Sequence, residues 1–302
     1  MSHAASEPPP ARARPVTLDE LKKHLQNQKD VALPPLETRP SDVFIATFSK
    51  SGTTWVQQIV HGLRTNGSMD FSEISLIIPW YEAAELLGID VNAPQLAEPR
   101  AFKTHLPWYK VPKGGRYIYV VRDPADALVS YYHYMNGVMF ERDTIELEAF
   151  CTEIFSRPKH FGTYFSHLQS WWEQRHRADV LSLCFEEMKE DHAGAVRRIA
   201  RFLGIDAGEE LLSRTTQQST FEFMLAHRDK FEDASVTKAF SRMRGLSPAS
   251  TAKIRAGRVG DGANLSASLR ATLDDAWARE LEGPLGLRSY AELRATMRGE
   301  RS

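Results

Sequence analysis

The feature that most constrains this chain is an apolar run that stops at a short polar loop and continues at once as an amphipathic helix. The run extends from Val43 to Phe48, and the helical pattern begins at Thr53. At this junction the chain supplies a lysine, a glycine and three hydroxyls: Lys50, Ser51, Gly52, Thr53 and Thr54. Backbone N–H groups at a helix start lack partners and carry partial positive charge, so they bind anions. The segment therefore predicts either a phosphate-sized anion site or a basic turn capped by one of its own hydroxyls.

This loop differs from the nucleotide-triphosphate loop. That motif requires a glycine, four residues and then Gly-Lys-Ser/Thr. Here Lys50 precedes Gly52, and no glycine stands upstream in the loop. The lysine therefore enters from the strand side, which weighs against a P-loop kinase or another phosphoryl-transfer enzyme but leaves that alternative open.

A second strand-to-helix turn also carries a cation. Tyr117 to Val121 is β-branched and aromatic without alternation, which predicts a buried parallel strand. Asp123 then caps a helix whose first position is proline. Arg122 follows the strand, and Ser130 lies about two turns into the helix. Ligands of open α/β sheets bind beyond the carboxyl ends of the strands, so two such turns predict two phosphates of one ligand. The alternatives are a salt bridge from Arg122 to a nearby aspartate and a solvated Ser130.

A third segment places a lysine and a histidine together. Phe102 to Leu106 has the pattern of a short strand, and Lys103 and His105 would then share one face. A neighbouring cation disfavours protonation of the imidazole, and a neutral imidazole can accept a proton from a hydroxyl. The segment predicts a general base, with a structural or surface histidine as the alternative.

Taken together, these segments resemble the cytosolic sulfotransferase family. The matching motifs are Lys-Ser-Gly-Thr-Thr-Trp ending at Trp55, Lys-Thr-His-Leu-Pro from Lys103, and Arg-x7-Ser from Arg122 followed by two tyrosines. Arg255 to Asp261 resembles the family's Arg-Lys-Gly-x-x-Gly-Asp loop. Weaker similarities are the stretches 185–189 and 219–224, and the resemblance covers roughly residues 35–285.

The resemblance implies the donor 3′-phosphoadenosine 5′-phosphosulfate and a set of roles. His105 would be the catalytic base, and Lys50 and Lys103 would stabilise charge on the transferring group and the departing phosphate. The remaining donor-binding residues fall into three groups. The 5′-phosphosulfate group is Lys50, Ser51, Gly52, Thr53, Thr54 and Trp55, with Trp55 also bordering the adenine. The 3′-phosphate group is Arg122, Ser130, Arg255, Ala256 and Gly257. The adenine group is Phe185, Ser219 and Phe221.

The chain departs from the family pattern at several positions. Ser49, Phe185, Ala256 and Gly262 stand where the family has Pro, Tyr, Lys and Trp. The family's dimer segment is absent near residues 263–272. We therefore expect donor affinity below the family's norm and a monomer or weak homodimer.

Composition excludes several partners and cofactors. The net charge is −1, so general attraction to nucleic acid is not expected. No apolar run is long enough for a membrane helix. The donor's activated anhydride needs no metal, and the histidines lack partner cysteines at zinc spacing. The two cysteines, Cys151 and Cys184, indicate no disulfide framework, which fits a cytoplasmic location.

The order of elements predicts an α/β fold. Strands at 43–48, 101–105, 117–122 and 180–185 alternate with helices, which favours a central parallel sheet flanked by helices, with a P-loop-like phosphosulfate-binding loop. We expect residues 36–302 to form one sulfotransferase domain and residues 1–35 to be a disordered extension. Further expected helices span 53–66, 80–88, 124–136, 144–156, 160–177, 189–203, 208–217, 219–227 and 266–281. We interpret residues 228–264 as a loop that forms a lid over the donor, with a solvated charged loop as the alternative for the part before Lys253.

The acceptor is the least constrained part of the prediction. Trp80, Tyr81, Met139 and Phe140 are near the motifs and suggest an apolar or aromatic pocket for a small hydroxylated acceptor. Three functions remain at this point. They are a small-molecule sulfotransferase acting on a hydroxyl or amine by in-line displacement, a phosphoryl-transfer enzyme, and a nucleotide-binding protein without activity.

Overall fold

The computed structural model describes residues 13–26, 32–155, 162–247 and 257–300. Its centre is a four-stranded, fully parallel sheet with the strand order β2-β1-β3-β4. The strands are β1 (Val43–Thr47), β2 (Ala101–Thr104), β3 (Arg116–Val121) and β4 (Val180–Cys184). In register, Val43 of β1 lies between Ala101 of β2 and Arg116 of β3, and Tyr117 of β3 pairs with Val180 of β4. The predicted α/β fold with a parallel sheet is confirmed.

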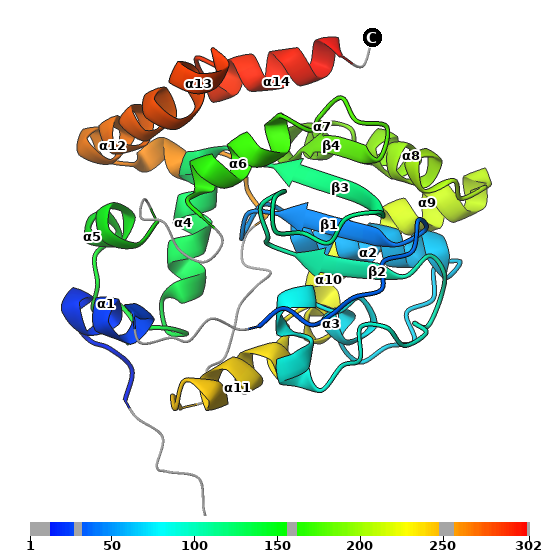
Figure 1. The fold of residues 1–302 in the computed structure, drawn as a ribbon, viewed down its shortest axis with the longest axis horizontal. Helices are drawn as coiled ribbons and strands as arrows, with labels where there is room; N and C mark the ends of the chain where they lie inside the picture. Colours follow the sequence, from blue (N-terminus) through cyan, green and yellow to red (C-terminus); the bar gives the residue numbers. More distant parts are fainter. Residues whose placement is uncertain (1–12, 27–31, 156–161, 248–256, 301–302) are drawn as a thin grey trace, which may run out of the picture.

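Both faces of the sheet are covered, which explains why the strands lack hydrophobic alternation. On one face Val43 and Ile45 pack against α2 (Thr53–Arg64) and α8 (His192–Leu203), with α9 (Glu209–Gln218) beyond. On the other face Phe44 and Tyr119 pack toward α4 (Pro124–Met135) and α6 (Tyr164–Trp172). Figure 1 shows these two helical layers on either side of the sheet. Because both faces are covered, every residue of β1 and β2 is buried, and only the first residue of β3 and the middle of the edge strand β4 are partly exposed.

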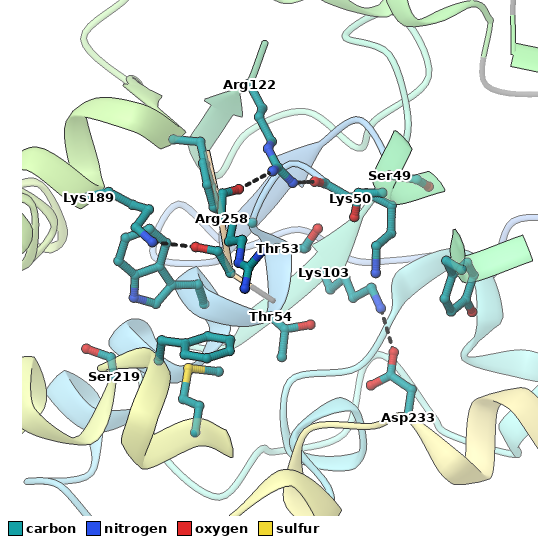
Figure 2. Close-up of a pocket in the computed structure, with 18 of the residues that line it drawn as sticks. Ser49, Lys50, Thr53, Thr54, Lys103, Arg122, Lys189, Ser219, Asp233 and Arg258 are labelled. Atoms are coloured by element: carbon teal, nitrogen blue, oxygen red, sulfur yellow. Dashed lines mark hydrogen bonds and ion pairs between the residues drawn. The ribbon is translucent and has the colours of Figure 1, made fainter. Parts of the chain in front are cut away.

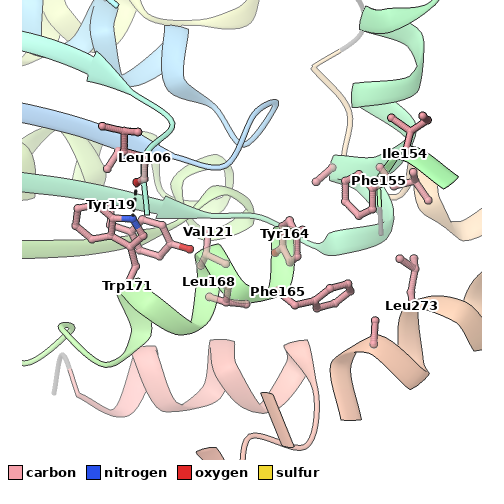
Figure 3. Packing of buried hydrophobic residues seen from close by; sticks show 14 of the residues in the cluster. Leu106, Tyr119, Val121, Ile154, Phe155, Tyr164, Phe165, Leu168, Trp171 and Leu273 are labelled. Atoms are coloured by element: carbon pink, nitrogen blue, oxygen red, sulfur yellow. Dashed lines mark hydrogen bonds between the residues drawn. The ribbon is translucent and has the colours of Figure 1, made fainter. Parts of the chain in front are cut away.

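Helix α6 anchors the end of strand β2. The Trp171 ring stacks on Tyr119 of β3, with 5.2 Å between centroids and an interplanar angle of 6°. Its indole Nε1 donates to the Leu106 carbonyl at 3.1 Å (Figure 3). Because Leu106 directly follows His105, this contact fixes the backbone where the predicted base leaves the sheet.

The remaining elements are mostly short helices. They are α1 (Leu18–Gln26), α3 (Ile74–Ile77), α5 (Leu147–Phe150) with a π-helical turn at Cys151–Phe155, α7 (Phe185–Glu190), α10 (Phe221–Ala226), α11 (Ala234–Met243), α12 (Ala267–Trp277) with a π-helical turn at Ala278–Glu282, α13 (Gly283–Leu285) and α14 (Tyr290–Gly299). Single 3₁₀ turns lie at Tyr81–Ala83, Glu85–Leu87, Arg228–Lys230 and Asp261–Asn264. Among the described residues, no helix is long and apolar enough to cross a membrane.

Several predicted element boundaries are wrong. The helix expected at 80–88 is two 3₁₀ turns, and the helix expected to begin at 189 is two helices, α7 and α8, separated at Asp191. The side chain of Asp191 accepts from Gly194 N and starts the second helix. The loop expected over 228–264 contains α11, whose residue Val236 is buried.

The expected disorder of residues 1–35 also differs from the structure. Residues 18–26 form α1, and Leu21 is fully buried in the larger core cluster. Arg14 donates to the Val138 and Ser247 carbonyls and ties this segment to the rest of the fold. Residues 1–12 and 27–31 lie outside the described residues.

Candidate functional site

The carboxyl ends of β1, β2 and β3 open into a cavity of about 390 Å³. The loop after β1, the first turn of α2, residues at the ends of β2 and β3, parts of α4, α7, α8 and α10, and Asp233 just before α11 contribute to its wall. The predicted site residues that line it are Lys50, Gly52, Thr53, Thr54, Trp55, Lys103, His105, Arg122, Ser130, Phe185, Ser219, Phe221 and Gly257. Figure 2 shows many of these side chains converging from separate crossovers.

A few predicted residues lie elsewhere. Ser51 is fully buried behind the loop and is absent from the cavity wall. Arg255 and Ala256 fall outside the described residues. Of the four residues expected at the acceptor pocket, only Trp80 lines the cavity. Tyr81, Met139 and Phe140 belong to the hydrophobic core. Although they are close to the motifs in sequence, their apolar side chains are buried against other core residues and do not face the cavity.

The loop after β1 presents backbone donors to the cavity. Lys50 and Gly52 have positive φ angles of 71° and 99°, which turn the chain sharply from the strand into α2. Gly52 precedes α2 without a side-chain cap, so capping by Ser51 or Thr53 is not observed. Instead Thr53 Oγ1 lies 2.6 Å from Thr47 Oγ1 on the strand. The first turn of α2 thus keeps its N–H groups for an anion.

Gly52 is required at its position for two reasons. Its φ angle of 99° is one that residues with a side chain rarely adopt, and a Cβ there would lie 2.9 Å from the Phe185 ring. The ring of Phe185 in turn contacts Trp55, with 5.5 Å between centroids. An aromatic wall therefore closes directly against the loop.

His105 is held as a neutral base would be. Its backbone N–H donates to Glu82 Oε1 at 2.6 Å, and its Nδ1 lies 2.8 Å from the Thr47 carbonyl. A carbonyl only accepts, so Nδ1 carries the hydrogen and the neutral ring keeps its lone pair on Nε2. The Trp80 ring meets the imidazole edge-on at 5.2 Å. The imidazole is thus oriented by β1 and screened by an aromatic side chain.

Glu82 supports this arrangement from a buried position. Its side chain is 4% exposed, and burial raises its pKa above the ordinary value. The backbone N–H of His105 opposes that shift because it donates to the carboxyl. No signal in the sequence identified Glu82, because it acts through a backbone group from a different crossover.

Arg122 joins the two loops that border the cavity. Its Nη1 donates to the Lys50 carbonyl at 3.0 Å and its Nη2 to the Arg258 carbonyl at 2.8 Å. The guanidinium lies over the Phe185 ring, 4.4 Å from its centroid. The alternative of a salt bridge is partly realised, since Asp126 Oδ2 lies 3.5 Å from Nη2. Asp123 instead caps α4, as predicted, by accepting from Ala125 N and Asp126 N.

The carboxylate of Asp126 holds the loop that precedes α12, called here the late loop (described from residue 257), against α4. It accepts from Gly260 N at 2.8 Å and from Gly262 N at 2.7 Å. A Cβ on Gly262 would lie 2.5 Å from Ala125 Cβ, so this packing admits only glycine. The departure from tryptophan at Gly262 is therefore explained by close contact between the loop and the start of α4.

The two lysines contact different groups. Lys103 Nζ forms an ion pair with Asp233 Oδ2 at 2.8 Å and lies 4.7 Å from the centroid of the Trp80 ring. Lys50 Nζ lies 4.8 Å from the centroid of the Tyr134 ring. Lys103 and His105 both reach the cavity, although β2 ends at Thr104 and His105 follows it.

Several residues of the cavity wall were not among the predicted site residues: Tyr134, Lys189, His192, Glu222, Asp233, Arg258 and Asp261. Of these, His192 borders the predicted adenine region, since its Nε2 lies 2.9 Å from Ser219 Oγ and its ring 5.1 Å from Trp55. Burial lowers the pKa of His192. Lys189 is the last residue of the stretch 185–189, which is similar to the family, and that similarity could have placed Lys189 at the site. Asp233 carries no such signal.

Comparison with known proteins agrees with this geometry. A family model described as "Sulfotransferase domain" matches residues 40–281. Sulfotransferase 1C2 of Oryctolagus cuniculus is 32% identical over 82% of this chain and 85% of its own length. Amine sulfotransferase of Oryctolagus cuniculus is 31% identical over 74% of this chain and 75% of its own length.

Solved structures share the fold. Retinol dehydratase in complex with androsterone and inactive cofactor PAP has a TM-score of 0.65 at 22% identity, covering 86% of each chain. Mouse sulfotransferase SULT7A1 complexed with PAP has a TM-score of 0.63 at 22% identity, covering 95% of each chain. The family match spans most of the sequence and includes every strand of the sheet. The chain therefore belongs to the sulfotransferase family, as its motifs indicated.

Proposed function

We propose that this sulfotransferase uses 3′-phosphoadenosine 5′-phosphosulfate (PAPS) and transfers its sulfuryl group in line to a hydroxyl or amine of a small acceptor. One observation carries the proposal. The uncapped start of α2, Arg122 and His105, which come from three different crossovers, border a single cavity. A doubly anionic nucleotide and a proton donor can share such a cavity. The alternative of a phosphoryl-transfer enzyme is not favoured, because the family match is to sulfotransferases.

The donor would lie across the sheet ends with its two phosphate positions at two helix starts. The loop of Lys50, Thr53 and Thr54 would bind the 5′-phosphosulfate through N–H groups and hydroxyls. Arg122 and Ser130 would bind the 3′-phosphate. Arg255, Ala256 and Gly257 belong to the same proposed subsite, although only Gly257 lies among the described residues.

The adenine would lie among aromatic side chains. Trp55, Phe185 and Phe221 line that part of the wall, together with Ser219. A Cβ on Gly257 would lie 2.4 Å from the Phe221 ring, so the late loop packs directly on this aromatic group. Such packing supports the proposal that Gly257 helps to close the nucleotide site.

His105 would take the acceptor's proton on Nε2 while the S–O bond to the donor breaks. The Thr47 carbonyl keeps the hydrogen on Nδ1, which leaves Nε2 as the accepting atom. Lys50 and Lys103 would stabilise negative charge on the sulfuryl oxygens and on the leaving phosphate. These residue roles follow from proximity to one cavity and need no metal ion in the proposed step.

The acceptor side of the cavity is aromatic. Trp80 borders it and packs on Phe240 of α11, with 5.2 Å between ring centroids. Tyr134 also lines the cavity. These side chains suit a small hydrophobic hydroxylated compound, and the 31% identical Amine sulfotransferase supports an amine as the second acceptor class. A cytoplasmic location and a monomer or weak homodimer are part of the same proposal.

The test is transfer of labelled sulfate from PAPS to a panel of phenols, sterols, alcohols and amines. We expect labelled product and release of 3′-phosphoadenosine 5′-phosphate (PAP) in equal amounts. Phosphorylated product from ATP with the same panel, in place of sulfated product, would contradict the proposal.

A further inference from the structure

Asp233 is a buried acid in the wall of a cavity that also holds Lys50, Lys103 and Arg122. It immediately precedes α11 and has a left-handed backbone, with φ 49° and ψ 44°. An acid at this position usually caps its helix, yet the Asp233 side chain makes no capping hydrogen bond. It is 2% exposed and lines the cavity instead. The backbone conformation thus turns the carboxylate inward.

The contacts of the carboxylate include one cation and one hydroxyl. Its Oδ2 accepts from Lys103 Nζ at 2.8 Å (Figure 2). Its Oδ1 accepts from Ser75 Oγ at 2.5 Å. Glu73, two residues before Ser75, accepts from Ser235 N at 3.0 Å and holds the start of α11 at the same place. Asp233 is therefore held on the Lys103 side of the cavity by contacts from two elements.

This ion pair competes with the role proposed for Lys103. Both side chains are almost fully buried, at 3% and 2% exposure, where water screens their attraction poorly. The transferring sulfuryl group is itself anionic, so its oxygens and the carboxylate are rivals for the same ammonium. Drawing the ammonium away from this buried carboxylate loses the attraction between the two charges, and that loss would oppose donor binding.

We propose that Asp233 is a positioning residue that holds Lys103 in the donor-free enzyme and yields it to the sulfuryl oxygens of bound PAPS. The proposal rests on the proposed function, because it takes Lys103 as a ligand of the sulfuryl group. Asp233 then sets how strongly the enzyme distinguishes PAPS from PAP. PAP lacks the sulfuryl group, so its binding leaves the Lys103–Asp233 pair intact.

The test compares binding of PAPS and PAP, without acceptor, to the wild-type enzyme and to Asp233→Asn. Asparagine keeps the shape and can still accept from Ser75, but it removes the competing charge. We expect PAPS to bind about tenfold tighter to the variant while PAP affinity changes less than twofold. Asp229→Asn is the matched control, because it removes one charge from an exposed position in the same segment. It should change neither affinity.

A second measurement uses the wild-type protein alone. In crystal structures with each nucleotide, the Lys103–Asp233 contact should persist with PAP and be absent with PAPS. An unchanged ratio of the two affinities in Asp233→Asn, or a Lys103–Asp233 contact that persists with PAPS, would overturn the inference. Failure of the wild-type enzyme to bind either nucleotide would instead overturn the proposed function.

Discussion

His105 is the residue on which the proposed chemistry depends most. Its tautomer is set by one backbone carbonyl of β1, and its backbone N–H is held by Glu82. We predict that His105→Ala lowers kcat by about 10²-fold or more, since a positioned general base contributes that much. PAP affinity, measured by calorimetry, should stay near the wild-type value because the imidazole faces the acceptor's proton. His176→Ala, at a 64% exposed side chain, serves as the control. Full activity in His105→Ala would show that another group takes the proton.

Arg122 has a structural and a proposed binding role, and nucleotides can separate the two. It donates to the Lys50 and Arg258 carbonyls, so its loss affects both loops. We predict that Arg122→Ala weakens PAP binding about 10- to 100-fold, in line with the loss of charge-assisted hydrogen bonds. Binding of AMP, which lacks the 3′-phosphate, should weaken much less. An equal loss for both nucleotides would mean that Arg122 only supports the loops. Arg279→Ala, at a 65% exposed side chain, is the matched control and should change neither affinity.

At the scale of elements, α6 fixes the backbone next to the catalytic region. Trp171 is fully buried and donates to the Leu106 carbonyl. We predict that Trp171→Phe lowers the free energy of unfolding by about 2–4 kcal/mol, because it leaves a cavity and an unpaired carbonyl. It should also lower kcat several-fold, since Leu106 follows His105. Urea denaturation and steady-state kinetics measure the two effects.

Trp172→Phe provides the matched comparison on the same helix. It removes the same ring volume at a side chain that is 7% exposed, whereas the hydrogen bond to the Leu106 carbonyl comes from Trp171. We expect a loss of stability without a loss of kcat. If both variants lower kcat equally, α6 acts by general packing and not through the Leu106 carbonyl.

At the scale of the whole molecule, two buried histidines make stability depend on pH. Burial lowers the pKa of His61 to about 4 and that of His167 to about 3. Unfolding restores ordinary pKa values near 6.5, so the unfolded chain binds more protons between pH 6.5 and pH 4. Stability from these groups is therefore full above pH 6.5 and is lost as the pH falls. Between pH 7 and pH 5 each histidine should lower the free energy of unfolding by about 2 kcal/mol.

Denaturation at pH 7 and at pH 5 measures this loss, and the variants His61→Gln and His167→Gln should each reduce it. A free energy of unfolding that is equal at the two pH values would contradict the assignment. His176→Gln, at an exposed position, should leave the pH dependence unchanged.

The sequence predicted the parts of the molecule that rest on local patterns. These parts include the turn from β1 to α2 and the cap of Asp123 on α4. The grouping of Lys50, His105 and Arg122 could also be predicted, because the carboxyl ends of parallel strands share one edge of the sheet. Strand order had no local signal, because any order of the four strands would bring such turns to the same edge.

Long-range contacts account for what the sequence could not predict. Asp233 reaches Lys103 across 130 positions of the chain, and Glu82 reaches the His105 backbone across 23. Neither acid belongs to a motif. Helix α11 was not predicted because its apolar positions lie within a segment rich in basic residues. Its contacts are also distant in sequence: Phe240 packs on Trp80, and Asp233, just before the helix, accepts from Ser75.

We propose that cations and helix starts from separate crossovers bind one nucleotide with both a 5′- and a 3′-anion. Calorimetric titration of the wild-type enzyme with PAP, and with ATP in the presence of Mg²⁺, tests this mode of binding. We expect one PAP per chain, bound at least 100-fold more tightly than ATP, because ATP lacks the 3′-phosphate that Arg122 and Ser130 would bind. Tighter binding of Mg²⁺–ATP than of PAP, or no binding of PAP at all, would contradict it.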